Sequence, residues 1–353
     1  MELKAVAALK PGMEIAQDVL DHKGNVIMRQ NTNLDKHLIQ KLTINSITCV
    51  YIKEPEDYFT TYFEKIKFSK TFQQFSVAYN SNFTVFKKII QRFLFDSSDM
   101  DNEALLNIIK NITEPFAKSK ITILDMLSVL ETSDKDFLYS HALNVALICN
   151  YTGKWFRLDD EEVDVLTLCG FYYDIGKTKI PQEILTKQGR LTQEEFEITK
   201  SHAVLGYQML QDCRIDERIK LAALMHHERC DGTGYPQRLK DERINKFAKI
   251  IAILDSYEAM TSYRTYRAPL CPFTVIEIFE RDGYGKYDTG CYLTFLERMV
   301  EEYIGKEVQL SDDTVCVVVL INKQKFSRPM VKTTDNKYID LSKEKDLSIK
   351  TLI

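Results

Sequence analysis

Apolar residues recur at helical spacing through most of residues 56 to 305. Spacings of three and four residues place such side chains on one face of a helix, which can then be buried against neighbouring helices. Two helix starts have capping signals, because Asp159 precedes Glu161 and Glu162, and Thr192 precedes Glu194 and Glu195. We therefore predict a mainly helical bundle. The predicted helices cover Phe83–Phe95, Leu105–Phe116, Leu127–Leu130, Ala142–Cys149, Val163–Tyr173, Phe196–Leu210, Ile219–Met225 and Ala248–Met260.

Short β-like runs and turn signals flank the helical region on both sides. Before it, we predict a helix over Leu34–Leu42 and a strand over Thr48–Ile52, which together indicate a small α+β unit. After it, the predicted strands are Val308–Leu310, Thr314–Ile321, Met330–Thr333 and Tyr338–Leu341. A chain of 353 residues exceeds a typical single domain. The predicted order is an α+β domain at 1–55, a helical connector at 56–130, a helical domain at 131–305 and a β-rich extension at 306–353.

Composition and charge indicate the cellular compartment and disfavour membrane and nucleic acid partners. No run approaches the roughly 20 apolar residues of a membrane span, and Lys4 and Lys10 bracket only five apolar residues near the N-terminus, too few for a signal peptide. We therefore expect a cytoplasmic protein with no membrane partner. The formal net charge of -4 gives no strong attraction to a nucleic acid polymer. The eight cysteines include no Cys-x-x-Cys pair, which excludes zinc-ribbon spacing.

Histidines and two aspartates are concentrated in the helical region. Four of the six histidines lie there, and the aspartates interrupt or end apolar runs. A carboxylate in an apolar run is costly unless it is paired or bound to metal, and imidazole with carboxylate is a donor set for divalent metals. Each residue taken alone also fits a capping, ion-paired or exposed role. The candidate ligands are His141, Asp174, His202, His226, His227 and Asp255.

The segment His226–Pro236 is the most specific in the chain. Adjacent helical side chains point about 100° apart, so His226 and His227 indicate either a helix end or a site approached from two sides. Two glycines, an aspartate and a proline follow and favour a tight, preset loop. A rigid loop therefore directly follows two candidate ligands.

In these motifs the chain resembles the HD-GYP phosphohydrolases, a branch of the HD-domain superfamily. The resemblance covers about residues 134 to 304. The residues before about 56 also look like the small domain that often precedes this one. The matching segments are Tyr139–Ala146, Asp174–Lys177, Ile180–Pro181, Leu191–Thr192 with Glu194–Phe196, Ser201–His202, Gly206–Tyr207, His226–Pro236, and Asp255–Tyr257 with Ala259–Ser262.

The resemblance implies an all-helical bundle that holds two or three metal ions, often iron or manganese. It implies hydrolysis of cyclic di-GMP, a bacterial second messenger, to the linear dinucleotide pGpG or to GMP. Two metals would lower the pKa of a bridging water and offset charge on the phosphoryl oxygens. By position, the metal ligands would be His141, Asp174, His202, His226, His227 and Asp255.

The resemblance also implies roles for individual residues. Asp174 would bridge the metals in catalysis, and Lys177 would contact a phosphate or help to protonate the leaving group. Arg264 and Arg267 would hold substrate phosphates and add fixed positive charge. The loop residues Gly234, Tyr235 and Pro236 would line the site and mediate contacts with a diguanylate cyclase or another signalling protein. A homodimer is a separate expectation.

Several positions depart from the family pattern. Tyr173 stands where a histidine ligand is expected. We favour a tyrosine that fills the space or forms a hydrogen bond. The alternative is a phenolate that binds a ferric ion, although the ordinary pKa of tyrosine is near 10. Phe137 replaces the glutamate of three-metal members, which argues against a third ion and against complete hydrolysis to GMP. Glu258 replaces the usual aspartate and keeps its charge with a longer reach. Tyr263 and Thr265 replace an aspartate and a proline near Arg264.

Three functions fit this sequence. The first is an active phosphodiesterase on cyclic di-GMP or a related cyclic dinucleotide, with activity reduced by the missing histidine. The second is a catalytically degenerate receptor or scaffold that binds a cyclic dinucleotide or a protein partner, which Tyr173 and Phe137 favour. The third is a hydrolase of another nucleotide phosphoester. The intact Gly234-Tyr235-Pro236 sequence favours this function less than the other two.

Overall fold

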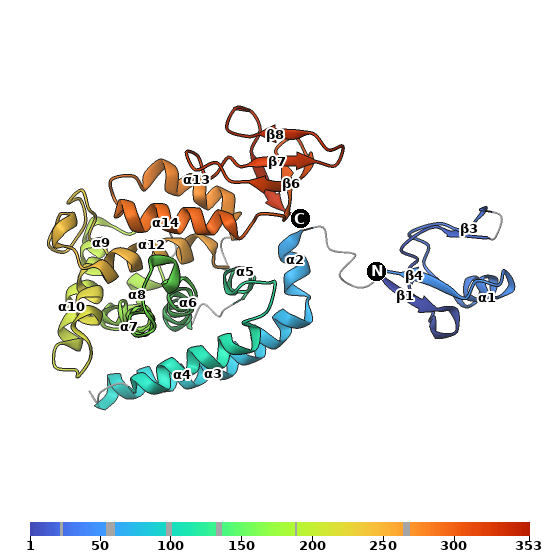
Figure 1. Cartoon of the computed structure of the whole chain (residues 1–353). Helices are drawn as coiled ribbons and strands as arrows, with labels where there is room; N and C mark the ends of the chain where they lie inside the picture. Colours follow the sequence, from blue (N-terminus) through green and yellow to red (C-terminus); the bar gives the residue numbers. More distant parts are fainter. Residues whose placement is uncertain (22–23, 54–60, 97–100, 132–135, 188, 264–268) are drawn as a thin grey trace. The chain divides into compact units, whose positions relative to one another are not determined.

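The structure is a computed structural model that describes residues 1–21, 24–53, 61–96, 101–131, 136–187, 189–263 and 269–353. The described residues form two compact units, Met1–Ser69 and Lys70–Ile353, each described by itself (Figure 1). The expected fold class is confirmed, because a mainly helical bundle is accompanied by small α+β and β-rich parts. Among the helices of these residues, none combines the length and apolar character that a membrane span requires.

The first unit is a small α+β structure. Strand β1 pairs antiparallel with β4, and β2 pairs antiparallel with β3. The core side chains include Ile15, Leu34 and Leu42, which are almost fully buried. The elements are β1 (Glu2–Ala5), η1 (Val6–Ala8), β2 (Val19–Leu20), β3 (Val26–Met28), α1 (Lys36–Ile44), β4 (Cys49–Ile52) and α2 (Tyr62–Lys67).

The second unit begins with the helices of the bundle. Helix α7 starts with a capping box of Asp159 and Glu162, and α9 starts with one of Thr192 and Glu195, as predicted. The helical elements are α3 (Lys70–Asp96), α4 (Asn102–Thr113), η3 (Glu114–Phe116), α5 (Ile123–Ser128), α6 (Phe137–Thr152), η5 (Gly153–Phe156), α7 (Asp160–Tyr172), η6 (Ile175–Lys179), α8 (Gln182–Leu185), α9 (Gln193–Lys200), α10 (His202–Leu210), α11 (Glu217–Met225), η7 (Asp241–Arg243), α12 (Lys246–Thr261), α13 (Pro272–Asp282) and α14 (Thr289–Glu301).

The centre of the bundle is built from helices that are apolar on most of their surface. Helices α6 and α11 each pack against both α7 and α12, and α10 packs against η6 and α11. Leu143, Leu166 and Ile250 are completely buried between them. Burial of such side chains contributes about 1.5–3 kcal/mol each. The packing fixes the helices whose ends carry the polar residues of the candidate site.

A five-stranded antiparallel sheet follows the bundle in the chain (Figure 1). Strand β9 of this sheet packs against α13. Its strand order is β8-β7-β6-β5-β9. Burial alternates along β6, as expected for a sheet with one face covered. The strands are β5 (Glu307–Leu310), β6 (Val315–Leu320), β7 (Met330–Thr333), β8 (Tyr338–Asp340) and β9 (Ile349–Leu352).

Two details differ from the helices and strands expected from the sequence. The predicted single helix Phe196–Leu210 is two helices, because the Ser201 hydroxyl and N–H both donate to the Ile198 carbonyl and tighten the turn. His202 thereby becomes the first residue of α10. Helices α2, α8, α13 and α14 and strands β1, β2, β3 and β9 were not among the predicted segments.

Candidate metal centre

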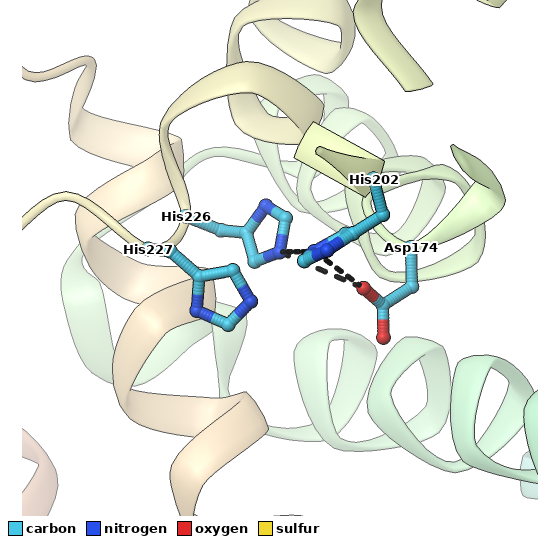
Figure 2. Close-up of side chains that lie close together, drawn as sticks. All are labelled: Asp174, His202, His226 and His227. Carbon is cyan, nitrogen blue, oxygen red and sulfur yellow. Dashed lines mark hydrogen bonds and ion pairs between the residues drawn. The ribbon is translucent and has the colours of Figure 1, made fainter. Parts of the chain in front are cut away.

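The structure brings all six predicted ligands together inside the bundle. One ligand atom from each of Asp174, His202, His226 and His227 lies within 4.8 Å of the others (Figure 2). A second group, His141, Asp174 and Asp255, meets the same limit, so Asp174 is shared. The ligands come from five places in the fold: His141 from α6, Asp174 from the end of α7, His202 from α10, His226 and His227 from the end of α11, and Asp255 from α12.

Close backbone contact between η6 and α10 brings Asp174 to His202. A Cβ atom on Gly176 would lie 2.0 Å from the His202 carbonyl oxygen and 2.5 Å from the Gly206 nitrogen. Only glycine therefore permits this contact at position 176. On the other side, α11 ends at Met225, so His226 and His227 lie at a helix end, one of the two arrangements that the sequence left open.

In the first group, acceptor atoms face one another. Nδ1 of His202 lies 2.6 Å from the Thr199 carbonyl oxygen, and Nδ1 of His226 lies 3.0 Å from that of Ala223. A carbonyl only accepts, so both Nδ1 atoms carry protons, as in the imidazole tautomer that binds a metal through Nε2. The two Nε2 atoms are 3.2 Å apart, and Oδ1 of Asp174 lies 3.4 Å and 3.6 Å from them.

The charges of this group fit a bound cation. Burial lowers the pKa of His202 to about 4 and that of His227 well below its usual value, so both are neutral near pH 7. Burial alone would raise the pKa of Asp174, but Lys177 and the imidazoles hold it well below its usual range. Within the described part of the chain, Oδ1 of Asp174 is buried without a hydrogen-bond partner. Three acceptors that converge with no proton between them are the arrangement that a divalent metal satisfies.

The second group has a different hydrogen-bonding pattern. The Tyr173 hydroxyl donates to Oδ1 of Asp255 at 2.9 Å and lies 2.7 Å from Nε2 of His141. His141 Nε2 is also 2.9 Å from the same Asp255 oxygen. Burial alone would lower the pKa of His141, but Glu258 and Asp255 raise it to about 10. Burial and the nearby carboxylates, first among them Asp255, raise the pKa of Tyr173 well above its usual value, so its hydroxyl keeps the proton.

A buried chain of hydrogen bonds fixes the His141 ring at its Nδ1 atom. Nδ1 of His141 lies 2.5 Å from a Glu258 carboxylate oxygen, whose other oxygen accepts from Asn144 at 2.8 Å. The Tyr79 hydroxyl on α3 donates in turn to Asn144 at 2.8 Å. Sequence reasoning noted Glu258 only as a substitution and missed Tyr79 and Asn144. A polar residue inside the apolar helix Ala142–Cys149 was the one available signal for Asn144.

The remaining residues singled out from the sequence lie around this centre. The Lys177 ammonium donates to Oδ2 of Asp174. The Phe137 ring stacks on His141 with 5.5 Å between ring centroids. An apolar ring therefore lies at the position where three-metal members of the family carry a glutamate ligand. Arg264, Thr265 and Arg267 lie outside the described residues.

The loop after His227 folds back against the centre. A Cβ atom on Gly234 would lie 2.5 Å from the His227 carbonyl oxygen, and the Tyr235 ring stacks on His227 with centroids 4.6 Å apart. The buried Glu228 carboxylate fixes the loop by accepting from the backbone N–H groups of Gln237 and Leu239. Glu228 was missed as a positioning residue, although a carboxylate directly after two candidate ligands is a recognisable signal.

A cleft of about 840 Å³ opens beside the loop and reaches His227. Its volume is that of a small-molecule site. Lys200, Arg229 and Arg238 give its lining positive charge, with Glu197 as a carboxylate. Pro236 also lines it, beside Gly234 and Tyr235. The cleft thus joins the candidate metal centre to a cationic surface that sequence reasoning did not identify.

Comparison with known proteins found a family model, curated relatives and a solved structure that are similar to this chain. The family described as HD domain matches residues 125–290. A cyclic di-GMP phosphodiesterase of Pseudomonas aeruginosa is 33% identical over 206 residues, which cover 58% of this chain and 49% of that protein. A cyclic di-GMP phosphodiesterase of Thermotoga maritima is 37% identical over 158 residues, 44% of this chain and 42% of that one.

Other relatives differ in the substrate that their names give. A 3'3'-cGAMP-specific phosphodiesterase of Vibrio cholerae is 29% identical over 196 residues, 54% of this chain and 46% of that protein. The chain spans about half the length of these curated relatives or slightly less. The solved structure of an HDGYP protein from Bdellovibrio bacteriovorus matches 84% of this chain and 99% of its own with a TM-score of 0.51. At 15% identity, that match shows a shared fold.

Proposed function

We propose that this chain carries an HD domain of the HD-GYP type and is a metal-dependent phosphodiesterase that hydrolyses cyclic di-GMP to pGpG. The observation that carries the proposal is the convergence of three imidazoles and the Asp174 carboxylate at the end of a cationic cleft. The Phe137 ring beside His141 supports a product that stops at the linear dinucleotide.

The metal that fits this donor set is a divalent ion, iron or manganese. The buried acceptor atoms of Asp174, His202 and His226 support this fit. When bound, such an ion activates water as the nucleophile and offsets charge on the phosphoryl oxygens. The resemblance implies two ions.

Residues of the chain supply the other requirements of the reaction. Lys177 keeps a positive charge beside Asp174, where it contacts a substrate phosphate or protonates the leaving oxygen. Lys200, Arg229 and Arg238 attract and orient the dianionic substrate in the cleft. Arg264 and Arg267 stay predicted phosphate-binding residues. Contacts with signalling proteins through the Gly232–Pro236 loop, a homodimer and a cytoplasmic location also stay predictions.

A second candidate function is a receptor that binds the cyclic dinucleotide without cleaving it. Tyr173 favours this function, because its hydroxyl hydrogen-bonds to Asp255 where the resemblance expects a metal-binding imidazole. Such a receptor would keep the cationic cleft and lack turnover.

The deciding experiment is metal-dependent turnover of the full chain, purified and reconstituted anaerobically with Fe²⁺ or Mn²⁺. We expect conversion of cyclic di-GMP to pGpG, measured by chromatography, and loss of at least about 100-fold in rate after chelation, because the chain's own cations cannot activate water. Re-addition of the metal should restore the rate. A panel with 3'3'-cGAMP and linear dinucleotides would define the substrate. Tight binding with no turnover under any metal condition would favour the receptor instead.

Removal of the Arg238 side chain is expected to weaken substrate binding more than catalysis. Arg238 is exposed in the cleft with φ of 55°, a left-handed conformation that glycine adopts freely, so Arg238→Gly removes the guanidinium without backbone strain. A charged hydrogen bond contributes about 1.5–3 kcal/mol. We therefore expect KM to rise about tenfold or more with kcat within about threefold.

The matched control for this variant is Arg157→Gly. Arg157 is also an exposed arginine with a left-handed backbone, at φ of 59°, and it lines a different cleft. Steady-state kinetics on cyclic di-GMP should be unchanged in Arg157→Gly. Equal KM values for the two variants would remove Arg238 from the substrate site.

A further inference from the structure

We infer that this chain holds a single metal ion, bound by Asp174, His202, His226 and His227, and that the Tyr173 hydroxyl closes the second metal position beside His141. The inference deepens the proposed function and rests on it only in treating this cluster as a metal centre. It concerns the number of ions and the role of one side chain.

The first group of ligands, which is Asp174 with the three histidines 202, 226 and 227, requires a cation. The Nδ1 atoms of His202 and His226 both face carbonyl oxygens, so their Nε2 lone pairs point toward each other across 3.2 Å. Oδ1 of Asp174 lies within 3.6 Å of both nitrogens and, among the described residues, has no hydrogen-bond partner. Unpaired buried acceptors of this kind are costly. A metal ion bound among them removes that cost, and Figure 2 shows His227 beside the same space.

In the second group of ligands, His141 and Asp255 already have hydrogen-bond partners within the protein. The Tyr173 hydroxyl contacts both atoms that a metal would need, Nε2 of His141 at 2.7 Å and Oδ1 of Asp255 at 2.9 Å. Metal ligands of these types bind at about 2.0–2.2 Å. A metal bound by both atoms would therefore compete with the hydroxyl for them and break its hydrogen bond to Asp255.

The tyrosine is held in this position. Its side chain is completely buried. The ring packs edge-on against His226, with centroids 4.9 Å apart, and edge-on against His141 at 6.0 Å. These ring contacts and the hydrogen bond to Asp255 together hold the side chain in place. The hydroxyl is consequently a fixed part of the centre.

Metal stoichiometry tests the inference directly. After anaerobic reconstitution with Mn²⁺ and removal of free ion, we expect one Mn²⁺ per wild-type chain by elemental analysis, with the electron paramagnetic resonance spectrum of an isolated ion. Tyr173→His replaces the hydroxyl by an imidazole and should bind two Mn²⁺ per chain, with the spectrum of a coupled pair. Tyr173→Phe frees His141 and Asp255 from the hydroxyl without adding an imidazole, so it should also take up a second Mn²⁺, more weakly than Tyr173→His.

Other outcomes would overturn the inference. None or two Mn²⁺ per wild-type chain would each do so, as would a single Mn²⁺ per chain in both folded Tyr173 variants. In Fe³⁺-loaded protein, a visible charge-transfer band that is lost in Tyr173→Phe would show that the phenolate is a ligand. If Tyr173→His fails to fold by circular dichroism, the wild-type stoichiometry and Tyr173→Phe decide.

The outcome is separable from that of the proposed function. One bound Mn²⁺ with no hydrolysis would support the inference and refute the phosphodiesterase. Hydrolysis by a chain that holds two ions would do the reverse.

Discussion

An Asp174→Asn variant is expected to lose its bound metal and at least about 10³-fold in kcat/KM on cyclic di-GMP, equivalent to about 4 kcal/mol of transition-state stabilisation. Asp174 is the one carboxylate in the four-residue group and is 2% exposed. Asparagine keeps the size of the side chain and removes the charge. Its amide can also donate to the imidazole nitrogens of His202 and His226, which would occupy the lone pairs that bind the metal.

The Asp174→Asn substitution should affect the metal centre and leave the rest of the fold unchanged. We expect circular dichroism and the melting temperature of Asp174→Asn to stay close to those of the metal-free wild type, because the substitution conserves volume. Asp313→Asn is the matched control, since Asp313 is an exposed carboxylate on the C-terminal sheet, paired with Lys350 at 2.8 Å. Full metal content and unchanged kcat/KM in Asp174→Asn would exclude this carboxylate from the centre.

Much of the bundle could be predicted from the sequence, because the helical spacing of apolar residues and the capping boxes are local signals. The structure confirms both capping boxes and places α7 and α12 close to their predicted ranges. Histidines and aspartates within or at the ends of apolar helices stand out against their neighbours, so the six candidate ligands could be named before any coordinates. Their metal-binding role stays a proposal.

The parts that could not be predicted depend on contacts between distant segments. Tyr79 meets Asn144 across 65 positions, and Asn144 meets Glu258 across 114, which no local pattern encodes. Lys200 and Arg238 line one cleft only because α9 and the loop after His227 fold together. The break at Ser201 was missed because apolar spacing continues across it, while the Ser201 hydrogen bonds tighten the backbone.

Tyr173 shows how geometry narrows an interpretation that residue type leaves open. From the sequence, a tyrosine in a histidine position fills space, hydrogen-bonds or binds a metal as phenolate. In the structure its hydroxyl donates to Asp255 among further carboxylates, which disfavour a second negative charge there. This arrangement supports the hydrogen-bonding interpretation and makes the number of bound ions the quantity to measure.

A Gly176→Ala variant is expected to lower the free energy of unfolding by about 3 kcal/mol or more and to release the metal. Overpacked sites typically lose 1–3 kcal/mol, occasionally more. The new Cβ would lie 2.0 Å from the His202 carbonyl oxygen and 2.5 Å from the Gly206 nitrogen, both backbone atoms that cannot rotate away. Helix α10 would have to move from η6, which separates His202 from Asp174. Denaturant unfolding and elemental analysis would measure the two effects.

Two other glycine substitutions calibrate this expected loss. A Cβ on Gly206 would come only to 3.3 Å from the Gly176 nitrogen, so Gly206→Ala should lose clearly less stability and keep its metal. A Cβ on Gly290 in α14 would meet only the Asp288 side chain at 3.4 Å, so Gly290→Ala should behave as wild type. If Gly176→Ala unfolds at the same denaturant concentration as Gly290→Ala and retains metal, close contact between η6 and α10 does not hold the centre together.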